Sequence, residues 1–387
     1  MGRLETSASS KPDPRQSSTL PNFDKEFSDQ LLSEDTHTRC RGNIGKYRQA
    51  PIIGWTVGRF DRSPFSDSLG FYYFDQVNAM QMRIGCVDLV SNTSFPALAA
   101  QELGYYKAEG LDVKIELVAM LGATKALRNG SVDAIIAGSV YDVLTEFPQW
   151  KGVKVVVALS QGSPWLLVVR ADLSAERGDL SAVKGLRITA AKGPDLVLRQ
   201  MLIGAKIDPD RDLQIVELPG AKARDVSFGV FAARALEAGQ IDGFWANAMG
   251  GETAVRRGVG KILVDVRRGD DPAEVRRFSF AGLATTEALI ERDPECVAAA
   301  VRAIVKTQRA LRAKPPLAAE VGQRLFPPEA AVLIATIVER DLPFYDPVIS
   351  EEAVTGLNRF AQSVGLLSGP VPYEQVVAVR FRDLWRS

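Results

Sequence analysis

Polar residues that could bind a small molecule follow directly on a short apolar run. This first group is Ser91, Asn92, Thr93, Ser94 and Phe95. The run before it, residues 83–88, is predicted as a strand, and residues 95–108 are predicted as a helix. Free backbone N–H groups at a helix N-terminus can bind an oxyanion. Ser and Thr also cap helices without any ligand, but the position of the loop after a strand favours binding.

Further candidate binding residues stand at the ends of other predicted strands. They are Gly138, Ser139 and Tyr141; Gln161, Ser163 and Trp165; Lys192 and Gly193; and Trp245 and Asn247. A tryptophan can form a wall for a planar ligand or belong to the core. Phe244 and Trp245 must point to opposite faces of a strand, so only one can line a cleft. We expect replacement of Asn92 or Lys192 by Ala to weaken ligand binding before it lowers stability.

Charged residues in these segments leave the ligand class open. Lys192 stands beside a predicted helix N-terminus and could anchor a carboxylate or sulfonate, or it could be a solvated charge. Asp195 in the first turn of that helix already satisfies the helix dipole. Asp142 would disfavour a bare anion nearby unless it were paired. The ligand is therefore expected to be anionic or planar and organic, and the two tryptophans favour an organic compound.

Composition excludes several classes of protein. The chain has 387 residues with 47 Lys plus Arg against 47 Asp plus Glu, so no basic excess indicates nucleic-acid binding. The only histidine, His37, lies in a polar segment, which excludes histidine-dependent catalysis and a His-ligated metal in the globular part. Cys40, Cys86 and Cys296 are far apart and predict neither a disulfide framework nor a zinc site. We expect no metal and no cofactor.

The N-terminal 81 residues differ from the rest. They are rich in Ser, Asp, Arg and Pro without a sustained period, and we interpret residues 1–81 as a disordered or loosely attached extension. No apolar segment of a secretory signal is visible there, and no run in the chain is long enough for a transmembrane helix. Met80 or Met82 would place an alternative start directly before the first strand.

Strands and helices alternate from residue 83 onward, which indicates an α/β fold. A first set of strands is predicted near 83–88, 112–117, 132–137 and 153–159. A second is predicted near 164–170, 186–191, 213–217, 241–246 and 261–265. The last hundred residues are predicted to be helical, with a final helix near 373–385, and to brace the first lobe. The pairs Arg256-Arg257, Arg267-Arg268 and Arg276-Arg277 are interpreted as a solvated face of mixed charge.

Three segments carry a family resemblance that covers roughly residues 82–365. They are Phe95–Val113, Gly122–Gly138 and Ala235–Trp245. Their patterns resemble the substrate-binding proteins of nitrate/sulfonate/taurine/bicarbonate-type ABC importers. These are type II periplasmic binding proteins, related to the binders of thiamine-pyrimidine precursors. The resemblance implies a two-lobe fold with mixed sheets, flanking helices and a helical C-terminal segment. Lobe I would comprise residues 82–162 and 266–387, and lobe II residues 163–265.

The resemblance also implies a function. The chain would be a monomeric receptor that captures a small anionic or planar organic solute in a cleft between its lobes, for a cognate permease and ATPase. A periplasmic or cell-envelope location is expected from the family, whereas the lack of a visible signal leaves a cytoplasmic location open. One alternative is a cytoplasmic ligand-sensing module. Another is a desulfinase-like enzyme with Cys86 as nucleophile, but no histidine is available to activate that thiol, so we expect no enzyme.

Overall fold

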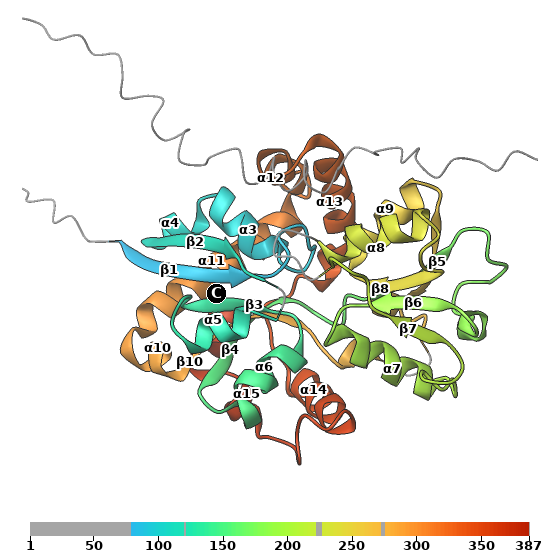
Figure 1. The fold of residues 1–387 in the computed structure, drawn as a ribbon. Helices are drawn as coiled ribbons and strands as arrows, with labels where there is room; N and C mark the ends of the chain where they lie inside the picture. Colours follow the sequence, from blue (N-terminus) through green and yellow to red (C-terminus); the bar gives the residue numbers. More distant parts are fainter. Residues whose placement is uncertain (1–78, 120, 222–226, 272–274, 387) are drawn as a thin grey trace, which may run out of the picture.

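The computed structural model describes residues 79–386, apart from residues 120, 222–226 and 272–274. Two five-stranded mixed sheets stand side by side in this part of the chain (Figure 1). The first has the order β2 (Leu111–Leu117), β1 (Met80–Cys86), β3 (Ala134–Ala137), β10 (Ala281–Thr286) and β4 (Val153–Ser160). The second has the order β7 (Gln214–Val216), β6 (Arg187–Ala190), β8 (Gly243–Ala246), β5 (Leu166–Arg170) and β9 (Gly260–Asp265).

Both sheets place the ends of their parallel strands at one edge. In the first sheet β1 runs parallel to β2 and β3, with Ile84 opposite Ile115 and Ala134. In the second, β6 runs parallel to β7 and β8. Since ligands of open α/β sheets bind outside the carboxyl ends of such strands, the loops after β1, β3, β6 and β8 are in the right place for a shared site.

Helices cover both sheets. Those beside the first sheet are α3 (Phe95–Glu102), α4 (Tyr105–Ala108), α5 (Ala123–Arg128), α6 (Val140–Glu146) and the 3-10 turn η1 (Pro148–Trp150). Those beside the second are η2 (Leu180–Val183), α7 (Pro194–Gly204), α8 (Phe228–Glu237) and α9 (Ala248–Arg256). Figure 1 shows α8 and α9 on one face of the second sheet and α7 on the other. Each sheet is therefore enclosed by apolar helix faces, as the α/β pattern requires.

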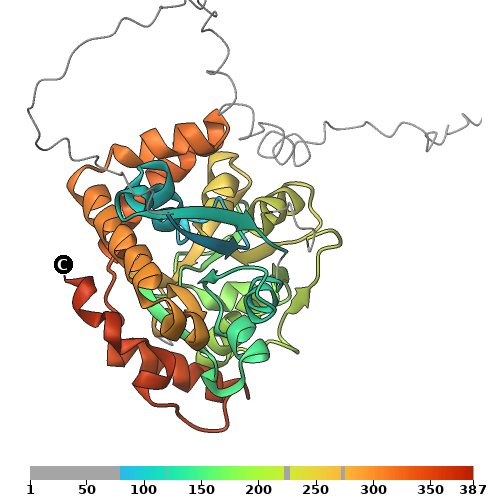
Figure 2. The same cartoon turned by 90° about the vertical axis from the view of Figure 1, so that its left-hand side faces the viewer.

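The C-terminal part is helical, as predicted. After the turns η3 (Val266–Arg268) and η4 (Val275–Arg277) and strand β10 come α10 (Glu287–Arg292), α11 (Pro294–Ala313), α12 (Leu317–Leu325), α13 (Pro328–Asp341), η5 (Leu342–Phe344), α14 (Glu351–Ser363), α15 (Tyr373–Val376) and η6 (Val379–Trp385). The long helix α11 packs on α3, α4 and β4 of the first sheet (Figure 2). Helices α12 and α13 differ from the expectation, because α12 contacts α3 while α13 contacts α9 beside the second sheet. They bridge the two halves instead of bracing one.

Two predicted helices are interrupted. The helix expected over 95–108 divides into α3 and α4 at Gly104, whose φ of 78° is a left-handed conformation that glycine adopts without strain. The helix expected over 373–385 divides between α15 and η6. There Val377 forms an isolated parallel bridge with Val155, and the N–H of Ala378 donates to the Val155 carbonyl at 3.0 Å. Backbone pairing with the edge of β4 outweighs the helical pattern.

Other expectations are only partly covered by the structure. The extension over 1–81 falls almost entirely outside the described residues, as do His37 and Cys40. Among the described residues, no helix is long and apolar enough to cross a membrane. The same residues hold no cluster of His, Cys, Asp or Glu side chains that could bind a metal ion.

A buried ionic network joins the two segments that connect the sheets. Arg267, in the returning segment, donates to Asp341 Oδ2 at 2.9 Å, to Ser160 Oγ at 2.5 Å and to the Gln161 carbonyl at 3.2 Å. The side chains of Arg267 and Asp341 are each only 2% exposed. The sequence-based interpretation of Arg267 as part of a solvated face is therefore wrong.

The same carboxylate holds the first polar loop. Asn92 Nδ2 donates to Asp341 Oδ2 at 2.7 Å, and Arg268 donates to Asp341 Oδ1 at 2.9 Å. Burial alone would raise the pKa of Asp341, but Arg267, Arg268 and Arg340 outweigh it and hold the pKa below its ordinary value. The network thus stays ionised at neutral pH and fixes the first loop, both connecting segments and the end of α13 to one another.

We predict that Arg267→Ala lowers the free energy of unfolding by about 3–5 kcal/mol, because it leaves a buried carboxylate without its main partner. Urea denaturation at pH 7 measures this loss. The control is Asp172→Ala, which breaks the exposed pair with Arg170 and should change the same free energy by about 0.5 kcal/mol or less. Losses of equal size in the two variants would show that the Arg267 network does not hold the connecting segments.

Candidate functional site

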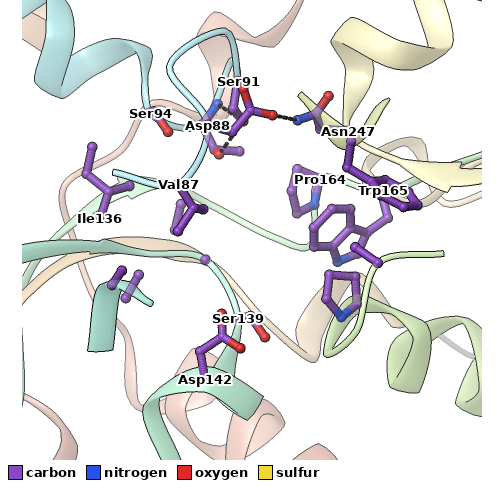
Figure 3. Close-up of a pocket in the computed structure, with 18 of the residues that line it drawn as sticks. Val87, Asp88, Ser91, Ser94, Ile136, Ser139, Asp142, Pro164, Trp165 and Asn247 are labelled. Atoms are coloured by element: carbon purple, nitrogen blue, oxygen red, sulfur yellow. Dashed lines mark hydrogen bonds between the residues drawn. The ribbon is translucent and has the colours of Figure 1, made fainter. Parts of the chain in front are cut away.

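A cavity of about 130 Å³ lies at the carboxyl ends of the parallel strands, between the two sheets (Figure 3). Segments of the first sheet that follow β1 and β3 form one side. The other side is formed by the connecting residues Pro164 and Trp165 and by segments that follow β6 and β8. Apolar side chains such as Val87, Ile136 and Phe228 make up much of the wall. Segments far apart in the sequence therefore line one shared space.

Many of the residues predicted for the site line this cavity. They are Ser91, Thr93, Ser94, Gly138, Ser139, Trp165, Lys192, Trp245 and Asn247. Trp245 lines the cavity whereas Phe244 is buried in a separate core cluster, so strand alternation decides between them as expected. The rings of Trp165 and Trp245 have centroids 6.4 Å apart and planes tilted by 30°. They offer an aromatic surface on the side of the second sheet.

Other predicted residues do not line the cavity, and each has another set of contacts. Asn92 is fully buried and bound to Asp341, as described above. Phe95 is fully buried in the core cluster that extends from α3 to the second sheet. Gln161 Nε2 donates to the carbonyls of Asp346 and Val348, and Ser163 Oγ donates to the Val275 carbonyl at 2.8 Å. These four side chains hold the loop and the connecting segments in place.

Tyr141 and Gly193, the remaining predicted residues, meet at the rim. Gly193 has a φ of 96°, and a Cβ atom there would lie 2.9 Å from Ser139 Oγ and 3.3 Å from the Tyr141 ring. Lys192 Nζ lies 5.8 Å from the centroid of that ring. Only glycine permits this close approach, so the segment before α7 closes against the segment before α6 across the cavity.

Asp88 forms a second contact between the halves and was missed as a site residue. Its Oδ2 accepts hydrogen bonds from Asn247 Nδ2 at 3.0 Å and from Ser227 Oγ at 3.2 Å, and its Oδ1 accepts from the Val90 N–H at 3.0 Å. Figure 3 shows the Asp88 carboxyl directed at Asn247. Burial raises the pKa of Asp88, although these hydrogen bonds oppose the shift. Its place at the end of the predicted strand 83–88 was the signal that could have identified it.

Asp142 is a further lining residue that the predicted set omitted. It stands in the first turn of α6, and its Oδ1 is buried with no hydrogen-bond partner among the described residues. Burial raises the pKa of Asp142 to about 7. In Figure 3 the carboxyl group rises from α6 toward the cavity, beside Ser139.

Cys86 does not have the surroundings of a nucleophile. It is fully buried in β1, where its Sγ lies 3.3 Å from the Asp88 carbonyl oxygen and 3.6 Å from Ser94 Oγ. Burial raises the pKa of the thiol to about 12, against small opposing effects of these hydrogen bonds. Since the thiolate is the reactive form, the Cys86 thiol is inert at neutral pH.

Comparisons with known proteins agree with this architecture. The chain resembles the putative periplasmic sulfonate-binding protein SsuA of a sulfonate ABC transporter from Methylobacillus flagellatus, with 19% identity, coverage of 80% of this chain and 94% of that chain, and a TM-score of 0.58. The periplasmic nitrate-binding protein NrtA from Synechocystis PCC 6803 is 15% identical, with coverage of 80% of this chain and 88% of that chain and a TM-score of 0.58. The desulfurization enzyme DSZB is 15% identical, with coverage of 79% of this chain and 99% of that chain and a TM-score of 0.58. No curated protein matches the chain in sequence.

These likenesses confirm the predicted type II periplasmic-binding-protein fold and the resemblance to substrate-binding proteins of ABC importers. At such low identities the solved structures show the fold alone. Both binding proteins and an enzyme have this fold, so the fold does not determine the function. The family model for the NMT1-like family matches residues 75–325. Because that match covers more than half of the chain, the protein belongs to the NMT1-like family.

Proposed function

We propose that the protein is the solute-binding receptor of an ABC importer, which captures a small anionic or planar organic solute in the cavity between its sheets. The observation that carries this proposal is the cavity itself, because residues of both sheets line it and two tryptophans form part of its wall. Enclosed, largely apolar cavities with a few polar groups are typical of small-molecule sites. The relatives named for sulfonate and nitrate binding support the same reading.

Capture would require the two halves to separate and close again. We propose the lobe bounds given by the sequence, residues 82–162 with 266–387 and residues 163–265. The contacts of Asp88 with Asn247 and of Gly193 with Ser139 lie on the cavity border, between segments of different sheets. A hinge motion about the connecting segments would break and remake both contacts. The closed form would then be presented to a permease and its ATPase.

Location and assembly follow from the same proposal. The solved relatives named above for sulfonate and nitrate are periplasmic proteins, and a periplasmic or cell-envelope location would place this receptor where an importer collects its solute. We propose that it acts as a monomer, since a single chain supplies both walls of the cavity.

An enzymatic role is the weaker candidate. The likeness to DSZB, which has been crystallised with biphenyl-2-sulfinic acid, favours a desulfinase-like reaction. A cysteine nucleophile for such a reaction would have to be Cys86 among the described cavity neighbours, and the thiol there is buried and protonated. Binding without turnover is the function that these surroundings support.

We predict that one class of solute stabilises the full-length protein in a thermal-shift screen of sulfonates, nitrate, bicarbonate, aromatic acids and pyrimidines. A ligand at a hundred times its dissociation constant adds about 2.7 kcal/mol to the folded state, which raises the melting temperature measurably. A panel in which no compound shifts the melting temperature would count against the receptor.

We predict that Trp165→Ala raises the dissociation constant of that solute about tenfold, since an aromatic contact contributes about 0.5–1.5 kcal/mol beyond its buried area. Isothermal titration calorimetry measures the change. Ile203→Ala, at a position 52% exposed on α7, is the control and should bind like the unaltered protein. Unchanged affinity in Trp165→Ala would remove this side chain from the site.

We predict that the protein releases no sulfite from biphenyl-2-sulfinate, because a thiol with a pKa of about 12 supplies almost no thiolate at pH 7. A colorimetric sulfite assay over several hours tests this. Turnover that disappears in Cys86→Ala would instead establish the enzyme.

A further inference from the structure

One oxygen of the Asp142 carboxyl group has no hydrogen-bond partner in the described part of the cavity. Its Oδ1 is buried without a hydrogen-bond partner among the described residues, and the side chain lines the cavity from α6 (Figure 3). Nearly all buried polar atoms of native proteins are paired, and an exception calls for an explanation. A donor group on a bound molecule would supply the missing partner.

Charges around the cavity favour such a donor over an anion. The ionisable side chains among its described lining residues are Asp88, Asp142 and Lys192. Asp88 already accepts three hydrogen bonds from protein groups. Lys192 is exposed and lies over the Tyr141 ring at the rim. The described interior therefore presents a carboxyl oxygen of Asp142 and the indole N–H groups of Trp165 and Trp245 without hydrogen-bond partners. Its described lining contributes no buried cation to balance a bound anion.

At two of the helices that border the cavity, α7 and α9, a backbone N–H group near the N-terminus is bound by a side chain of the protein. At α7 the N–H of Gly193 donates to Asp195 Oδ1 at 2.8 Å. At α9 the N–H of Gly250 donates to Asn247 Oδ1. Helices α3, α5, α6 and α8, whose first residues or caps also border the cavity, have no side-chain cap within the described part of the chain. Two of the backbone sites that could hold a sulfonate or carboxylate are thus engaged before any ligand arrives.

Among the residues that the structure describes, no cation of a neighbouring element compensates the charge of Asp142. Helices α5 and α14 pack against α6. Arg128 on α5 pairs with Glu146 at the far end of α6, and Glu352 on α14 pairs with Arg277. Burial accounts for the raised pKa of Asp142, with no contribution from a charged neighbour. The titration of this group is therefore set by its removal from water and would respond directly to a ligand.

The space suits a single flat ring. Its volume of about 130 Å³ is similar to that of an engineered cavity of roughly 150 Å³ that binds benzene. Trp165 and Trp245 provide aromatic surface on one side, and Val87 and Ile136 provide apolar contacts on the other (Figure 3). A ligand with a single aromatic ring would contact both walls at once.

We propose that the cavity selects a flat aromatic or heteroaromatic compound, neutral or cationic, whose N–H group donates a hydrogen bond to the Asp142 carboxylate. This proposal rests on the receptor function and chooses the planar organic ligand over the anionic one. The Asp142 carboxylate selects against a negatively charged ligand, and the tryptophan wall selects a flat one.

The test compares two probes with the same ring and opposite charge, benzamidine and benzenesulfonate, by calorimetric titration of the full-length protein between pH 6 and pH 8. Asp142 has a pKa of about 7, so its deprotonated fraction rises about tenfold over this range. Both probes keep their charge throughout. Benzamidine affinity should therefore increase about tenfold with pH, and benzenesulfonate should bind more weakly than benzamidine at pH 8.

Asp142→Asn should remove the pH dependence and lower benzamidine affinity at pH 8 at least tenfold. The control Glu146→Gln makes the same chemical change on the same helix outside the cavity lining and should keep the pH dependence. Thermal unfolding of both variants checks that each is folded. The Asp142→Asn substitution should not lower the melting temperature, because it removes a buried carboxyl group.

Tighter binding of benzenesulfonate than of benzamidine, strengthened in Asp142→Asn, would overturn the proposed ligand class and leave the receptor function standing. So would a failure of both probes to bind while another solute of the screening panel does. A protein that binds neither the probes nor any member of the panel would fail as a receptor, and the proposed ligand class would fall with it.

Discussion

The buried pair of Arg267 and Asp341 is the interaction on which the site depends. Its arginine comes from the segment that returns from the second sheet, and its carboxylate comes from the end of α13. Ser160, at the start of the outgoing segment, and Asn92, in the first polar loop, bind the same pair. Because a charge removed from water must keep its partners, these four pieces of chain hold one fixed arrangement beside the cavity.

Around that fixed point, the two sheets meet at the cavity border through polar and backbone contacts, and they also meet through an apolar cluster that extends from α3 to β8, α8 and α9. Asp88 accepts hydrogen bonds from the second half, and Gly193 brings its backbone against Ser139. The network ties the ends of the connecting segments, and the apolar cluster, which includes residues of α12 and α13, also joins the two halves.

The interior of the cavity then decides what can be held there. Strand alternation turns Trp245 inward, and the connecting segment adds Trp165, so one wall is aromatic. Across from it, Asp142 is partly desolvated and keeps an oxygen without a partner. An aromatic wall and an acceptor select by shape and by hydrogen bonding. The indole N–H groups of Trp165 and Trp245, on the same wall, are donors without a partner in the described part of the chain, and Asp195 occupies the Gly193 N–H at the start of α7.

The sequence by itself determined the alternation of strands and helices and with it the α/β class, because apolar periodicity and turn residues are local properties. The two-lobe arrangement was expected only from the family resemblance. The sequence also located the loops at strand ends and required that only one of Phe244 and Trp245 line the cavity, and the structure places Trp245 there. Only the tertiary structure decided which polar residues face the ligand. Asn92 and Arg267 look solvated or ligand-binding in sequence, yet they are buried with Asp341, a residue far along the chain. Partners brought together by folding, and not residue type, determine whether a polar group is available to a solute.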